Sequence, residues 1–195
     1  MVELTVRHTI SNEGRTLTRV VDGAGWPWAA GLPLPVVGAS SWKVRVEQSD
    51  ENYGNMLIGV CDEAARCGWG LDLCFGMLLR YSRDANGQRI FAPPPDGFPD
   101  GVGTQVMKDE AGQPASLNGK TIGAVIEILV DHDAGTLGFR VNDGPLLHAL
   151  GGFEGAALRP YAALFDRNDQ MSFVLPYTLT PEDDHVPLTL LELPN

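Results

Sequence analysis

The sequence predicts an all-β protein with a β-sandwich architecture. Its 195 residues include 23 glycines and 14 prolines, which supply many turns and few helix interiors. Short segments alternate apolar and polar residues with the period of two of a half-buried strand, and turn residues separate these segments. We find no internal repeat and no long amphipathic helical pattern. Several short strands spaced in this way indicate two packed sheets.

The N-terminal part of the chain predicts a hairpin and then a connection. Residues 3–20 alternate around a Ser-Asn-Glu-Gly turn, which is typical of a β-hairpin. Residues 23–35 have no sustained period and contain three prolines, which lack the N–H group that a sheet needs, so we expect an ordered or semi-ordered loop. Trp26 and Trp28 lie inside this expected loop. Each tryptophan either packs over the edge of the sandwich or is presented to a partner.

The middle of the chain predicts further strands and one long loop. Residues 42–46 alternate, with Trp42 on the buried side, and residues 56–60 are a continuous apolar run. These segments predict two neighbouring strands. Residues 69–83 again look extended, and a turn and a long Pro- and Gly-rich loop follow, to about residue 116.

The clearest local pattern is a hairpin that ends in a second turn. Residues 122–130 place their isoleucines on one face and other apolar residues on the opposite face, which predicts a central strand covered on both sides. In residues 131–144 a tight turn leads into a strand whose Leu137 and Phe139 share the buried face. The following Asn-Asp-Gly tolerates the positive φ angles that short hairpin loops demand.

The C-terminal part predicts two more strands and a tail. Residues 158–165 and 171–175 read as strands joined by the polar turn Asp-Arg-Asn-Asp. The tail from residue 180 is acidic, and we expect an edge strand within residues 186–193.

Composition excludes several classes of partner. The formal charge of −11 makes DNA or RNA an unfavourable partner, because affinity for these polyanions comes largely from Lys and Arg. Anionic membrane surfaces are disfavoured for the same reason. No apolar stretch approaches the roughly 18 residues of a membrane span, so we expect no signal peptide or anchor. With an odd number of cysteines and no glycosylation motif, the sequence predicts a cytoplasmic or nuclear protein.

Two motifs resemble known sites and lack essential residues. Asp131-x-Asp133-x-Gly135 begins like a calcium loop, but Thr136 stands where that loop needs glycine and Asn142 stands where it needs glutamate. We therefore predict a structural turn at this segment.

Residues 119–121, Gly-Lys-Thr, resemble the end of a phosphate-binding loop. Pro114 occupies the position of the required glycine, and a strand pattern follows instead of a helix. This segment is also predicted to be a turn.

The sequence shows no pattern typical of a metal site, a cofactor site or a catalytic site. Cys61, Cys67 and Cys74 lack the paired spacing of a zinc site, and the four histidines are scattered. No cysteine stands beside a histidine or at a helix start that would activate it. We expect buried free thiols, no metal, no cofactor and no catalytic residues.

Five ordered segments together resemble the SPRY domain family. They are the Trp-x-Val-x-Val strand (42–46), Ile-Gly-Val (58–60), Trp-Gly-Leu-Asp (69–72), the hydrophobic strand running into Asp-x-x-x-Gly-Thr-Leu-x-Phe and Asn (123–142), and Leu-x-Pro (158–161). The match is strongest over residues 36–178. The resemblance implies a bent antiparallel β-sandwich of concanavalin-like jelly-roll topology, formed by a single domain over residues 1–178. Residues 179–195 would then be a C-terminal tail or edge strand.

The chain departs from the family pattern at two points. The Leu-Asp-Pro element of the longer PRY-SPRY form is missing, and Asp143 is inserted where the family usually passes from Asn to Gly, which predicts a hairpin loop one residue longer. None of the modules that often accompany the domain is visible, such as a RING finger, a coiled coil or a suppressor-of-cytokine-signalling box.

The resemblance implies a non-enzymatic, monomeric adaptor that binds a short peptide or loop of a partner protein through its inter-strand loops. By position, the residues that match the family's binding loops form two groups: Asp62, Glu63 and Arg66, and then Phe165, Asp166, Arg167 and Asn168. We add Trp26 and Trp28 as candidate partner-binding residues. Trp42 and Trp69 sit in strand patterns and are predicted to be core residues. An alternative is a carbohydrate-binding sandwich that stacks sugars on Trp26, Trp28 and Tyr53.

Overall fold

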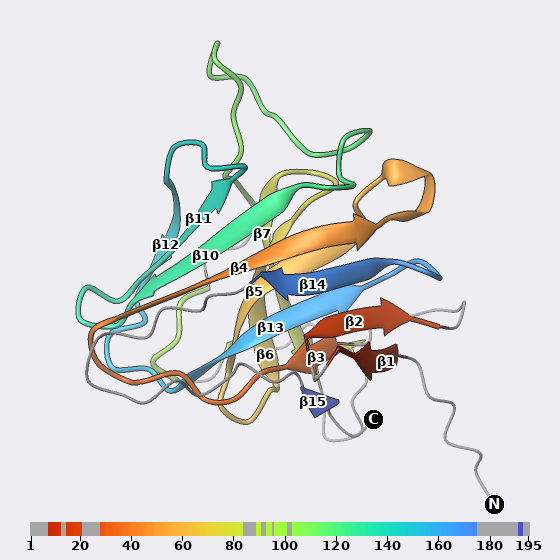
Figure 1. Ribbon diagram of the computed structural model, residues 1–195. Helices are drawn as coiled ribbons and strands as arrows, with labels where there is room; N and C mark the ends of the chain where they lie inside the picture. The colour runs from red at the N-terminus through yellow and green to blue at the C-terminus, as the bar shows by residue number, and fades with distance from the viewer. Residues whose placement is uncertain are drawn as a thin grey trace, which may run out of the picture.

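The computed structural model describes residues 8–12, 15–20, 28–83, 89–90, 93–94, 96–100, 103–174 and 191–192. Within these ranges nearly all regular structure is strand, and the single helical element is the short 3-10 turn η1 (Asp50–Asn52). The strands form two antiparallel sheets packed face to face (Figure 1), so the predicted all-β sandwich is confirmed. No helix among these residues is long and apolar enough to cross a membrane.

The first sheet of the described residues has seven strands. In spatial order they are β1 (His8–Ser11), β2 (Thr16–Arg19), β14 (Gln170–Val174), β4 (Ala39–Gln48), β10 (Val125–Asp131), β11 (Thr136–Val141) and β12 (Leu147–Gly151). The predicted N-terminal hairpin is present as β1 and β2, whose pairing ends at Ser11 and Thr16.

The second sheet has eight strands in the same part of the chain. In spatial order they are β15 (Leu191–Glu192), β3 (Trp28–Ala30), β13 (Leu158–Leu164), β5 (Met56–Asp62), β6 (Cys67–Asp72), β7 (Met77–Arg83) and β8 (Arg89–Ile90), and β9 (Thr104–Gln105) pairs with β7. Strands β4 and β5 are consecutive along the chain but lie in different sheets, so the prediction that they are neighbours is wrong in space. The two-residue strand β15 lies at the edge of this sheet, within the residues where an edge strand was expected.

The hairpin of β10 and β11 is confirmed in detail. Leu137 and Phe139 are fully buried. The second turn follows β11 and begins the connection to β12: Asn142 and Asp143 both adopt positive φ angles, of 49° and 57°, and the N–H of Gly144 donates to the carbonyl of Val141 at 2.9 Å. Asn and Asp are residue types that tolerate this backbone conformation. The inserted aspartate therefore occupies a regular turn position.

The predicted start of the β10 strand is wrong. Ile122 was expected on the buried face, but the strand begins at Val125 and the Ile122 side chain lies outside the core. Gly123 adopts a φ of 83°, a left-handed conformation that turns the chain before the strand starts. β10 does lie inside the sheet, between β4 and β11, with one face buried and the other half-buried.

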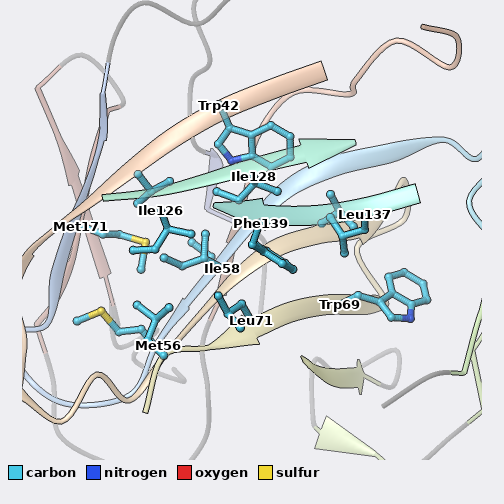
Figure 2. Packing of buried hydrophobic residues seen from close by; sticks show 14 of the residues in the cluster. Trp42, Met56, Ile58, Trp69, Leu71, Ile126, Ile128, Leu137, Phe139 and Met171 are labelled. Carbon is cyan, nitrogen blue, oxygen red and sulfur yellow. The ribbon is translucent and has the colours of Figure 1, made fainter. Parts of the chain in front are cut away.

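The main core lies between the two sheets. Figure 2 shows Trp42, Ile126 and Ile128 from the first sheet facing Ile58 and Leu71 from the second, and all of them are buried. Trp42 and Trp69 are only 3% and 0% exposed, which confirms both as core residues.

Trp69 also anchors the segment of residues 98–100 to the sandwich. Its ring stacks on Phe98 at 5.1 Å between centroids and meets the edge of Phe153 at 5.3 Å, and its indole N–H donates to the Pro99 carbonyl at 3.0 Å. A salt bridge of 2.9 Å between Arg80 and Asp100 holds the same segment. The residues around Phe98 thereby become part of the packed domain.

A second, smaller apolar cluster lies on the other face of the eight-stranded sheet. Leu57 and Cys61 alternate along β5 with residues of the main core, and they pack with Tyr161 of β13 and Tyr81 of β7. Because both faces of β5 are buried, its sequence is a continuous apolar run.

Candidate functional site

The two groups of predicted binding residues lie at opposite ends of the sandwich. β5 and β13 run antiparallel, and their register pairs Asp62 with Leu158 and Met56 with Leu164. The loop after Asp62 and the loop after Leu164 are therefore separated by the length of β5, about 20 Å at the rise of a β-strand. They cannot form one continuous binding surface.

One end, called here the Tyr53 end, is built from four loops. They comprise residues 49–55, 73–76, 117–123 and 165–169. In Figure 1 the orange loop that contains η1 and the blue turn between β13 and β14 meet at this end.

Main-chain hydrogen bonds join the four loops to one another. The N–H of Gly119 donates to the Asn52 carbonyl at 2.9 Å, and the N–H of Phe165 donates to the Asn55 carbonyl at 3.2 Å. A third bond of 2.9 Å runs from the N–H of Leu117 to the carbonyl of Leu73. The surface of this end is thus held by the fold, even though it consists of loops.

The buried carboxylate of Asp169 fixes two of these loops together. One of its oxygens accepts the N–H of Asp50 at 3.0 Å and the other accepts the N–H of Asp166 at 2.9 Å. The side chain is fully buried, and this burial raises the pKa of Asp169 to about 6. The amide of Asn55 adds a bond of 2.7 Å to the Asp166 carboxylate.

Three large apolar side chains are exposed at the Tyr53 end. Tyr53 is 42% exposed, Ile122 is 52% exposed and Phe75 is 62% exposed, and each comes from a different loop. The hydroxyl of Tyr53 bonds to the carboxylate of Glu51, and this bond raises the pKa of the phenol. The sequence did not predict that Phe75 and Ile122 are surface residues. It suggested Tyr53 only as a ring on which a sugar could stack.

The predicted residues of this end are placed as follows. Phe165 and Asp166 are half-buried, whereas Arg167 and Asn168 are exposed. Trp28 lies in strand β3, in register with Ala163, so its expected place in a loop is wrong. A short run that pairs with β13 was not recognised as a strand because prolines and glycines flank it. Trp26 lies outside the described residues.

At the opposite end, one of the three predicted binding residues is buried and the other two are exposed. Asp62 is buried, and one of its carboxylate oxygens accepts the N–H groups of Arg66 and Cys67, both at 2.7 Å. The structure therefore gives Asp62 a structural role in the turn between β5 and β6. Glu63 and Arg66 are exposed there.

The two motifs predicted to be structural turns have that role. The Asp131 carboxylate accepts the N–H groups of Asp133 and Ala134, at 3.1 and 2.9 Å. Thr121 is fully buried, with its hydroxyl 2.7 Å from the Leu117 carbonyl. Over the described ranges, no three His, Cys, Asp or Glu side chains are grouped so that they could hold a metal ion.

The cysteines differ in accessibility. Cys61 and Cys67 are buried free thiols, as predicted, while Cys74 is half-buried. Burial raises the pKa of all three thiols.

We expect native protein to react with iodoacetamide slowly at Cys74 and not at Cys61 or Cys67, because the thiolate is the reactive form. Mass spectrometry of the labelled native and urea-unfolded protein measures this, and fast native labelling of Cys61 would contradict it.

Comparison with known proteins identifies the family. A family model described as the SPRY domain matches residues 39–178, which is most of the chain. The chain belongs to the SPRY domain family. This result confirms the resemblance read from the five sequence segments. No curated protein sequence is detectably similar to the chain.

Two solved SPRY domains illustrate the shared fold. The SPRY domain of human HERC1 superposes with a TM-score of 0.57 at 16% identity, over 85% of this chain and 91% of that one. The PSpry domain of TRIM65 superposes with a TM-score of 0.52 at 12% identity, over 87% of this chain and 86% of that one. SPRY domains generally serve as protein-interaction modules.

Proposed function

We propose that this SPRY domain is a non-enzymatic interaction module that binds a peptide or loop of a partner protein at the Tyr53 end. The observation that carries this proposal is the exposure of Tyr53, Phe75 and Ile122 on adjoining loops of one end. Exposed aromatic and aliphatic side chains of this size are typical anchors of protein interfaces. The exposed Arg167 beside the half-buried Phe165 extends the same surface with a side chain that interfaces favour.

The rigidity of this end supports the proposal. Glu51 and Asn52 hold positive φ angles of 43° and 60°, and the amide oxygen of Asn52 accepts the N–H of Ile122 at 2.8 Å. A non-glycine residue in this region costs free energy and persists only where the surroundings enforce it. A surface fixed in this way loses little conformational entropy when a partner docks.

We test the surface with the double variant Phe75→Ser and Ile122→Ser. Both side chains are largely exposed, so we expect the variant to fold normally and to lose partner proteins that the wild-type domain retains from cell extract. Quantitative mass spectrometry of the retained proteins measures the loss. Phe165→Ala with Arg167→Ala is expected to weaken the same partners.

The matched control is Leu146→Ser, which removes an exposed apolar side chain from the loop between β11 and β12. We expect it to retain every partner. If all partners stay bound to the Phe75 and Ile122 double variant with an unchanged unfolding midpoint, the assignment of this surface is wrong.

Carbohydrate binding is kept as a second candidate because Tyr53 presents an exposed aromatic ring. A glycan array distinguishes the two functions. Strong hits that free sugar displaces, and that Tyr53→Ser abolishes, favour a lectin-like function over protein binding.

A further inference from the structure

Two adjacent valines are exposed at the end of the sandwich opposite to Tyr53. Val36 is 47% exposed and Val37 is 69% exposed. They lie in residues 31–38, which connect β3 of one sheet to β4 of the other. Figure 1 shows this connection crossing to the start of β4 at the left, beside the turn between β10 and β11. We call this the Val37 end, and its other loops comprise residues 62–66, 131–135 and 152–157.

The backbone on both sides of the valines is fixed. The N–H of Leu34 donates to the Leu158 carbonyl at 2.8 Å, which ties the connection to β13. The N–H of His132 donates to the Gly38 carbonyl at 2.8 Å, and the N–H of Gly38 donates to the Asp133 carboxylate at 3.0 Å. The two valines are therefore exposed on a segment whose backbone is held on both sides by hydrogen bonds.

Exposed acidic side chains lie on the other loops of the Val37 end. Asp133 is bonded directly to the turn. Glu154 lies over the neighbouring turn, since a methyl group at Gly135 would come within 2.4 Å of its carboxyl carbon. Glu63 lies in the loop after β5. Its main-chain carbonyl is 3.4 Å from the Arg159 guanidinium, which also bonds to the Gly31 carbonyl at 2.7 Å.

The basic side chains of this end do not balance these acids. Arg159 is half-buried and directs its guanidinium to the two carbonyls, and Arg66 is exposed. Against them stand the exposed Glu63, Asp133 and Glu154 and the half-buried Asp131, so the described part of this end has an excess of negative charge. A partner of opposite charge is favoured at such a surface.

We propose that the Val37 end is a second interaction surface, which takes a protein segment whose apolar side chains stand between lysines or arginines. The apolar side chains would cover Val36 and Val37, and the flanking cations would pair with Asp133 and Glu154. This inference goes beyond the proposed function, because the two ends are separated by about the length of β5, roughly 20 Å. The domain can therefore hold one partner at each end.

The probe is a synthetic hexapeptide with a Val-Val pair between two lysines, titrated into isotope-labelled protein and followed by amide NMR shifts. We expect saturable shifts at the Val37 end, centred on residues 36–38 and 133–134, and unchanged amides at residues 49–55. The fitted affinity should fall at high salt, because exposed charges are screened. Peptides with two glutamates around Val-Val, or with two lysines around Gly-Gly, should each bind at least about tenfold more weakly.

Two double variants test the contributions separately. Val36→Ser with Val37→Ser removes the apolar pair, and Asp133→Asn with Glu154→Gln removes two charges. Each should weaken the lysine peptide by about tenfold or more, whereas Phe75→Ser with Ile122→Ser should leave it unchanged. The proposal is overturned if the peptide gives no saturable shift at this end, if the glutamate peptide binds equally well, or if the shifts follow the Tyr53 end.

Discussion

Replacing Gly59 with alanine is expected to destabilise the domain severely. Gly59 lies in the middle of β5, opposite Gly70 of β6 and Tyr161 of β13. A methyl group there would stand 2.0 Å from the carbonyl oxygen of Trp69 and 2.8 Å from the Cα of Gly70. Both atoms are backbone of the neighbouring strand, so no side-chain rotation relieves the clash.

The cost of this substitution should be exceptional for one methyl group. We expect a loss of about 4 kcal/mol or more in the free energy of unfolding, out of the roughly 5–15 kcal/mol of a typical domain. Urea unfolding monitored by tryptophan fluorescence measures it, together with the soluble yield. The glycine of the Ile-Gly-Val segment is thus explained by the close approach of β6.

Gly151→Ala is the matched control. Gly151 also lies in a strand, its φ is not positive, and the nearest atom to an added methyl group is 4.0 Å away. We expect a change within about 1 kcal/mol. Equal stability of the Gly59 and Gly151 variants would show that the sheet can open at β5, contrary to the close approach described here.

Replacing Asp169 with alanine is expected to loosen the Tyr53 end. The substitution leaves the N–H groups of Asp50 and Asp166 without the acceptor that they now share. Both hydrogen bonds are partly buried, and a buried donor left unpaired costs about 1–3 kcal/mol, so we expect a loss within about 1–3 kcal/mol in the free energy of unfolding. Faster hydrogen exchange at residues 49–55 and 165–168 should accompany it.

The control for this variant is Asp109→Ala. The exposed carboxylate of Asp109 also accepts two main-chain N–H groups, those of Ala111 and Gln113 at 2.9 and 2.8 Å. Water can replace these bonds, so we expect a loss below about 1 kcal/mol. A loss as large as that of the Asp169 variant would mean that burial is not the reason for the effect.

Asp169 also gives stability a defined dependence on pH. Its native pKa of about 6 lies above the ordinary value of 3.8, because burial disfavours the charged form. The folded state therefore holds the proton of Asp169 more tightly than the unfolded chain does. This proton binding adds to the free energy of unfolding in full below pH 3.8, and the added stability is lost as the pH rises through 6. The stability of the wild type relative to Asp169→Asn should decrease from pH 4 to pH 7, and a constant difference would contradict the assignment.

The opposite arrangement of the two ends has a consequence for function. The Asp169 carboxylate bonds to loops of the Tyr53 end, whereas the anchors of the Val37 end run through Gly38, Asp133 and His132. Loosening one end should leave the other intact. Binding of the lysine peptide to the Asp169→Ala variant offers a direct check of this independence.

Much of the fold could be predicted because strand signals are local. Trp42, Leu137 and Phe139 alternate with polar residues, and this period of two alone predicts that they face the core. The turn at Asn142 and Asp143 was predictable for a similar reason, because these residue types tolerate positive φ. Trp28 was placed in a loop because a strand of three residues gives too short a pattern to recognise.

The binding surface could not be predicted in the same way. Asp62 ends one strand and Phe165 follows another, and nothing in their local sequence shows that the two adjoining loops lie at opposite ends or that Asp62 is buried. The exposure of Phe75 and Ile122 could not be predicted either, because an apolar residue near a strand is normally expected in the core.

Local patterns in the sequence were enough to predict the SPRY family, the all-β class, the main strands and the turns, since these depend on residues close together in the chain. The three-dimensional arrangement was needed to show which loops meet, which carboxylates are buried and which apolar side chains face solvent. The physical reason is that strand order and register arise from pairing between distant segments, and those pairings place Tyr53, Phe75 and Ile122 at one end and Val36 and Val37 at the other.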